Sequence, residues 1–170
     1  LFEKEGPKYY NDDPWTIRNK YIDVILDRNY TTIKKFQKEN FNSDLLEEDR
    51  IKGMELLEIQ RQAMLMYTSC GWFFSEISGI ETVQIMKYAA RAMQLAAHFS
   101  NENYEEHFLN ILSEAKSNIK EFGTGKDIYE RFVKPSVVTA KEVACLWAIS
   151  SLYQDFDDEE DVYCYTVQRN

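Results

Sequence analysis

The sequence contains few of the residues that build metal centres and disulfide frameworks. Its three cysteines, Cys70, Cys145 and Cys164, are odd in number and far apart, and none forms a C-x-x-C pair. Neither a zinc knuckle nor a disulfide framework is therefore indicated, and reduced thiols are the simplest interpretation. The two histidines, His98 and His107, have no carboxylate at ligand spacing, so we expect no metal site.

Motifs that bind phosphate or supply a nucleophile are also missing. The chain has no Gly-rich phosphate cradle, no nucleophile elbow and no Cys/His pair at a catalytic spacing. Glu55 and Glu58 lie on the polar side of a predicted helix, and paired carboxylates in principle do acid–base work on a glycoside. Glutamates on a helix surface are far more often solvated. We therefore predict no catalytic residue and no cofactor in this chain.

Positive charge and long apolar runs are scarce as well. The 20 basic residues are outnumbered by 29 acidic ones, which gives a net charge of −9. Such a chain is repelled overall by nucleic acid and by an anionic membrane, so we expect neither as a partner. No signal peptide is visible, and the longest apolar stretches are too short to span a bilayer. We expect a cytoplasmic protein.

Apolar side chains are frequent enough for a packed core, and their spacing is mostly helical. The 170 residues are 44% hydrophobic and 14% aromatic. We expect residues 1–12 to form a loop, and Asn101 or Asn103 to cap a helix. Further helices are predicted over 14–28 with an Asp13 cap, after caps at Ser43 and Ser136, over 79–99, and over Lys126–Val133. The fold class is all-α, a multi-helix bundle of about six to seven helices with a short β-strand at the C-terminus.

The C-terminal segment differs from the rest. The acidic run Asp155–Asp161 is typical of a charged linker, and Val162–Val167 alternates as a strand does. A lone strand needs neighbours, and none is predicted before it. We therefore divide the chain into a helical accessory domain, 1–160, and the start of a β segment, 161–170, which we expect to continue beyond the last residue.

The centre of the chain is unusual, because small and hydroxyl residues over 68–79 surround three consecutive rings, Trp72, Phe73 and Phe74. Ser78 and Glu81 have the spacing of a capping box for the next helix. Polar residues form one narrow stripe on that helix: Gln84, Lys87, Arg91, Gln94 and His98. The rings either lie at the mouth of a cleft, where they pack on the C–H face of a sugar, or plug the helix junction as core.

Tyr88 and Arg91 lie one turn apart on that next helix, on the same side. The five donors of an Arg suit sugar hydroxyls. The alternative is an Arg that satisfies helix carbonyls or pairs with Glu76 or Glu81. Both interpretations stay open at this point.

The stretch Leu57–Arg91 resembles an uncharacterised helical region found C-terminal to the catalytic barrel in proteins of glycoside hydrolase family 57. The segments Tyr21–Arg28 and Val143–Tyr153 resemble it too. In the α-glucan enzymes of that family, a helical region packs on an incomplete β/α barrel and sends an aromatic loop toward the substrate cleft. Their motif resembles Ser-Asp-Trp-Pro-Phe, with a Gly seven residues after the Trp and then a Tyr and an Arg on the following helix.

Trp72 and Gly79 keep that separation, Phe74 matches the Phe of the motif, and Tyr88 and Arg91 match the helix pair. Two features depart from it: Phe73 replaces the proline, and the step from Gly79 to Tyr88 is about one helical turn longer. The family's nucleophile Glu and acid/base Asp belong to the barrel. The resemblance implies an accessory domain whose Trp72, Phe74, Tyr88 and Arg91 bind substrate. Its partners are then the upstream catalytic barrel of the same polypeptide and an α-glucan or oligosaccharide. The alternative is a purely structural or protein-interaction domain.

Overall fold

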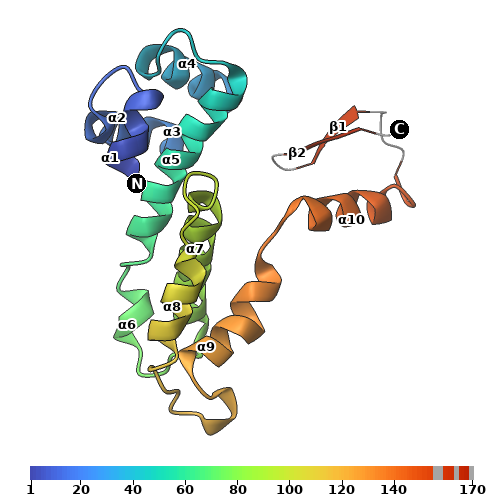
Figure 1. The fold of residues 1–170 in the computed structure, drawn as a ribbon. Coiled ribbons are helices and arrows are strands. Elements are labelled where there is room, and N and C mark those ends of the chain that lie inside the picture. Colours follow the sequence, from blue (N-terminus) through green and yellow to red (C-terminus); the bar gives the residue numbers. More distant parts are fainter. Residues whose placement is uncertain (155–158, 163–164, 169–170) are drawn as a thin grey trace. The chain divides into compact units, whose positions relative to one another are not determined.

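The computed structural model describes residues 1–154, 159–162 and 165–168. The chain divides into two compact units, Leu1–Pro135 and Ser136–Asn170, and each is described by itself. The first unit is built of helices (Figure 1): α1 (Phe2–Glu5), α2 (Pro14–Lys20), α3 (Ile22–Leu26), α4 (Tyr30–Asn40), α5 (Glu47–Leu65), α6 (Cys70–Phe73), α7 (Ile80–Ala96), α8 (Tyr104–Leu112) and α9 (Gly125–Ile128). Short 3-10 turns cover Gly6–Lys8, Lys120–Phe122 and Lys134–Ser136, and a π-helical turn, Tyr129–Val133, continues α9.

The long helices α5 and α7 pack along each other and form the axis of the first unit (Figure 1). On α7 the buried positions are mostly small or apolar, and Gln84, Arg91 and His98 of the predicted polar stripe are exposed. The π-helical turn packs against α7 and contributes the buried Tyr129 and Val133. As predicted, α7 therefore lies centrally in the first unit, but Lys87 and Gln94 of the predicted polar stripe are half-buried, so the stripe is only partly exposed.

The main hydrophobic core lies where the N-terminal helices meet α5 and the end of α7. Its buried members are Phe2, Tyr9, Tyr10, Ile17, Tyr21, Val24, Phe36, Phe41, Leu56, Leu57, Ile59, Leu95 and Ala96. The prediction of a loop over residues 1–12 is therefore wrong, because α1 and a 3-10 turn carry three rings into this core. Their sequence has no helical period, since each turn is too short to show one.

Helix starts were predicted with mixed success. Asp13 caps α2 and Asn103 caps α8, each side chain accepting a backbone N–H two or three residues into its helix. The predicted helix over 14–28 breaks at Tyr21, whose N–H is shared by the carbonyls of Ile17 and Arg18. Its two parts are α2 and α3.

Three predicted serine caps are wrong. The long helix α5 begins at Glu47, after Leu46, rather than after Ser43. The N-cap of α7 is Gly79 without a side-chain hydrogen bond, and the N–H of Ser78 donates to the Glu76 carboxylate at 2.9 Å instead.

The second unit contains α10 (Ala140–Ser150) and two strands, β1 (Glu159–Val162) and β2 (Tyr165–Gln168). The third serine cap fails here, because a capping box of Thr139 and Glu142 starts α10 rather than Ser136. The strands pair antiparallel, with Glu159 opposite Gln168 and Val162 opposite Tyr165.

The all-α class with a short C-terminal β element is confirmed. The strand predicted over Val162–Val167 is instead the ends of two paired strands, because the last residues of the acidic run form β1. Residues 155–158 of that run, and Cys164, lie outside the described residues. The division at residue 160 stays a prediction.

Candidate functional site

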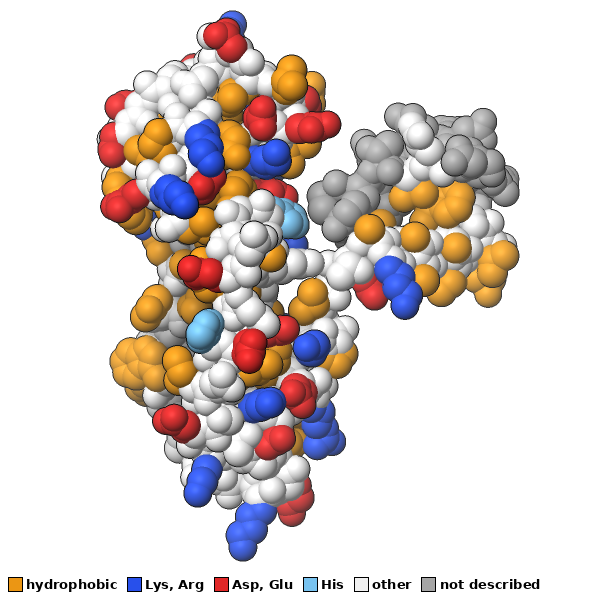
Figure 2. Space-filling model, viewed as in Figure 1, with side chains coloured by type: hydrophobic (Ala, Val, Ile, Leu, Met, Phe, Trp, Pro, Cys, Tyr) orange, Lys and Arg blue, Asp and Glu red, His pale blue; other side chains and the backbone are white. Residues whose placement is uncertain are grey.

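Three large rings, two on α6 and one at the residue that follows it, are exposed to solvent. Trp72 and Phe73 are each 72% exposed and Phe74 is 51% exposed. The rings of Phe73 and Phe74 meet edge to face, with their centroids 5.5 Å apart. We call these three side chains the α6 surface. Figure 2 shows hydrophobic side chains gathered at the edge of the first unit where Figure 1 labels α6. Their exposure excludes the interpretation in which they plug the core.

The backbone of α6 is held against α7 by a close contact at Gly71. A Cβ atom at this residue would lie 2.7 Å from Cγ1 of Ile85, so only glycine allows this approach. The hydroxyl of Thr82 also donates to the carbonyl of Gly71 at 3.3 Å. The rings of the α6 surface are therefore carried on a backbone fixed by α7, although they themselves are exposed.

The segment after the rings is fastened by the carboxylate of Glu76. It accepts hydrogen bonds from the Ser117 hydroxyl at 2.6 Å, the Ser78 N–H at 2.9 Å and the Asn118 N–H at 2.8 Å. These bonds, the one from Ser117 first, lower the pKa of Glu76 to about 2. Glu76 therefore joins the loop that follows α6 to the loop near residue 117, and it does so as an ionised group.

Tyr88 and Arg91 lie on α7, the first half-buried and the second exposed. Arg91 donates to the amide oxygen of Gln94 at 2.5 Å. Within the described residues, neither side chain makes a hydrogen bond or ring contact with Trp72 or Phe74, and Arg91 pairs with neither Glu76 nor Glu81. The structure thus brings the ring of Phe74 against that of Phe73, exposes Trp72 as their neighbour in the sequence, and leaves Tyr88 and Arg91 as separate positions on the neighbouring helix.

A family model, domain of unknown function DUF3536, matches residues 1–170. The chain belongs to this family. No curated protein and no solved structure matches it. The family description names no activity, so the relation of this DUF3536 domain to glycoside hydrolase family 57 stays a prediction.

The paired carboxylates of α5 have other partners in the DUF3536 domain. Glu58 accepts hydrogen bonds from the Tyr21 hydroxyl and from Arg28, and Arg61 lies 3.5 Å from its second oxygen. Burial by itself would raise the pKa of Glu58, but the Tyr21 hydrogen bond and the two arginines outweigh it and lower the pKa. A carboxyl group held ionised in this way is a poor general acid.

Glu55 is similarly engaged, with its Oε2 atom 3.0 Å from Nδ1 of His98. The sequence gives no signal for the contact of Tyr21 and Arg28 with Glu58, because 37 and 30 residues separate these pairs. The hydrogen bonds of Tyr21 and Arg28 to Glu58 hold the ends of α3 on α5, and we assign them no catalytic role.

The described residues were also compared with the requirements of a metal site and of a membrane-spanning helix. No three His, Cys, Asp or Glu side chains gather at a possible metal site within residues 1–154 and the two short strands. The thiols of Cys70 and Cys145 are free and exposed. In the same part of the chain, no helix has both the length and the apolarity needed to cross a bilayer.

Proposed function

We propose that this DUF3536 domain is a non-catalytic helical accessory domain of an α-glucan-active enzyme resembling glycoside hydrolase family 57. It packs on the catalytic barrel of the same polypeptide and contributes Trp72 and Phe74 to the substrate cleft. The observation that carries the proposal is the α6 surface, in which three exposed rings stand on a backbone held by Gly71 and Glu76. Large apolar rings that are exposed on a fixed backbone are typical of a binding site.

The mechanism of such a domain is positional. Ring faces of the α6 surface pack on the C–H faces of glucose units, and Tyr88 and Arg91 offer hydrogen bonds to hydroxyls further along the chain of sugars. The glucan is thereby oriented for carboxylates on another domain, and the gain comes from proximity rather than from chemistry at these residues. The rings need no rearrangement to bind, since they are already exposed.

A structural or protein-interaction role is the second candidate, and a different observation favours it. Large apolar side chains are also exposed on other elements of the first unit, among them Leu26, Tyr30 and Ile111. Such side chains suit contact with a second protein domain as well as with a sugar. In that role the domain braces the barrel, and the α6 surface is covered by protein.

Replacing Trp72 by alanine in the full-length protein separates the two candidates. If the ring stacks on the glucan, Trp72→Ala lowers the affinity for a maltooligosaccharide about 10-fold, measured by calorimetry. The free energy of unfolding changes by less than about 0.5 kcal/mol, because the side chain is exposed. Tyr30→Ala, at an exposed ring on another helix, serves as the control and leaves the affinity unchanged.

Two results would overturn the proposal. One is a large loss of stability in Trp72→Ala with normal glucan affinity per folded molecule, which supports the bracing role. The other is turnover of maltooligosaccharides by the DUF3536 domain alone, which contradicts its non-catalytic assignment.

A further inference from the structure

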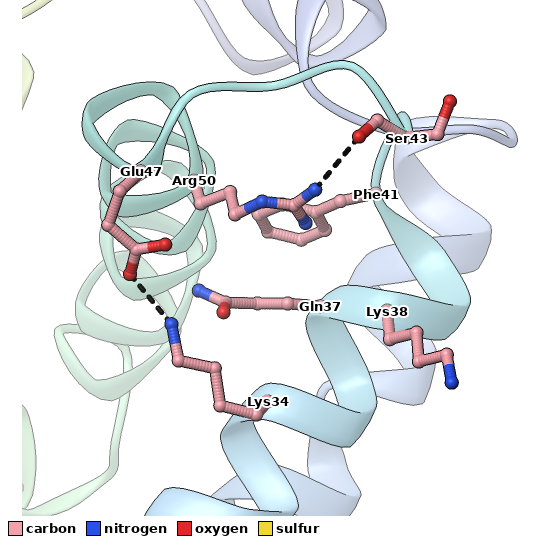
Figure 3. A pocket seen from close by; sticks show the side chains of 7 residues that line it. All are labelled: Lys34, Gln37, Lys38, Phe41, Ser43, Glu47 and Arg50. Atoms are coloured by element: carbon pink, nitrogen blue, oxygen red, sulfur yellow. Dashed lines mark hydrogen bonds and ion pairs between the residues drawn. The ribbon is translucent and has the colours of Figure 1, made fainter.

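A pocket of about 320 Å³ lies between α4 and the beginning of α5, away from the residues assigned to glucan binding. Figure 3 shows Lys34 and Gln37 reaching into it from α4, and Glu47 and Arg50 facing them from α5. Phe41 also lines it. Its volume is within the range of small-molecule sites and larger than a bare inorganic anion requires.

The side chain of Gln37 is buried in this pocket without a partner. It is 5% exposed, and its amide oxygen has no hydrogen bond. Its amide makes no other hydrogen bond within the part of the chain that the structure describes. Figure 3 shows the amide extending across the pocket between Lys34 and Arg50. A buried acceptor without a donor is unfavourable, so this residue points to a ligand that donates a hydrogen bond to it.

The cationic groups of the pocket favour an oxyanion. The guanidinium of Arg50 donates to the carbonyl of Ser43 at 3.1 Å (Figure 3). It has no carboxylate partner among the described residues, so its remaining N–H groups are available to a phosphate or carboxylate. The pocket also contains an acceptor, the carboxylate of Glu47, which lies 2.7 Å from the Lys34 ammonium.

We infer that this pocket binds a small hydroxylated organic anion of the sugar phosphate class. The anionic group takes the free N–H groups of Arg50, and a hydroxyl of the same ligand donates to the buried amide oxygen of Gln37. The carboxylate of Glu47 accepts a hydrogen bond from a hydroxyl of the same ligand. The inference does not depend on the α6 surface.

Titration calorimetry of the full-length protein with glucose 6-phosphate tests the inference. The wild-type protein should bind it more tightly than inorganic phosphate, which lacks the hydroxyls, and more tightly than glucose, which lacks the charge. Gln37→Leu removes the amide at nearly constant volume and should weaken binding about 10-fold or more without loss of thermal stability. Arg50→Gln should weaken it by a similar factor.

Lys35→Gln is the matched control for Arg50→Gln, because it removes one positive charge from an exposed residue of α4 that does not line the pocket. Its affinity should equal that of the wild type. The inference is overturned if the wild-type protein does not bind glucose 6-phosphate at millimolar concentration, or if Gln37→Leu binds it normally. Equal binding of glucose or of inorganic phosphate likewise overturns the assigned ligand class.

Discussion

Gly53 stands in the buried middle of α5, where a larger residue would collide with the core. A Cβ atom there would lie 2.6 Å from Cε2 and 2.9 Å from Cζ of the Phe41 ring. That ring is only 3% exposed, and it meets the rings of Tyr10 and Phe36 at centroid distances of 5.3 and 6.1 Å. Tyr10 and Phe36 therefore block movement of the ring on their sides, and only the side that lines the pocket between α4 and α5 is open.

Two effects of Gly53→Ala oppose each other. Alanine is the better helix former by about 1 kcal/mol. Overpacking a filled core costs about 1–3 kcal/mol. A shift of the α5 backbone would also weaken the buried hydrogen bond from the Tyr10 hydroxyl to the Gly53 carbonyl, 2.7 Å long, for which about 1 kcal/mol is typical. The overpacking and the weakened hydrogen bond outweigh the gain in helix propensity, so we expect the free energy of unfolding to fall by about 2 kcal/mol.

Urea denaturation measures this loss directly, and a melting temperature lower by about 4–8 °C is the corresponding thermal result for a chain of this size. Phe41→Leu provides the matched background, since it shortens the side chain that the new methyl group meets. In a double-mutant cycle, Gly53→Ala should be much less harmful in Phe41→Leu than in the wild type. A Gly53→Ala protein as stable as the wild type, or no coupling between the two substitutions, would refute the reasoning.

Three further predictions concern hydrogen bonds. Because the pKa of Glu76 is lowered to about 2 from its ordinary 4.5, its ionised form contributes stability that is complete above pH 4.5 and lost as the pH falls toward 2. The difference in unfolding free energy between wild type and Glu76→Gln should shrink over that interval, and a difference independent of pH contradicts the assignment. Thr139→Ala removes the cap of α10 and should cost about 1 kcal/mol, seen as faster amide exchange in its first turn; unchanged exchange speaks against the cap. Tyr10→Phe deletes the bond to the Gly53 carbonyl and should cost about 1 kcal/mol in urea denaturation, whereas no change means that the bond adds nothing to stability.

The N-caps of the helices show what a local sequence pattern can predict and what it cannot. Asp13 and Asn103 cap as predicted, because a cap needs only an acceptor two or three residues before a backbone N–H. Ser78 does not, because the Glu76 carboxylate takes its N–H and is itself held by Ser117 from 41 residues away. A pattern of four residues contains no information about such a competitor.

The candidate site likewise has features that the sequence predicts and features that only the structure shows. The sequence singles out the run of three rings and its hydroxyl neighbours, but it predicts neither the four-residue helix α6 nor whether the rings face core or solvent. The structure shows that Gly71 lets the backbone of α6 approach Ile85 and that the three rings are exposed. The pocket at Gln37 has no sequence signal, since a buried glutamine and an exposed one look alike in a helical pattern.

The amino-acid sequence by itself determined the helical class, the apolar and polar faces of α7, and the helix caps that depend on adjacent residues, because these follow from periods and contacts within one turn. Only the tertiary structure decided that Gly53 must stay glycine, that Glu76 joins two distant loops, and that the α6 rings face solvent. Each of these depends on which side chain from another element fills the neighbouring space, and close packing settles that for the molecule as a whole.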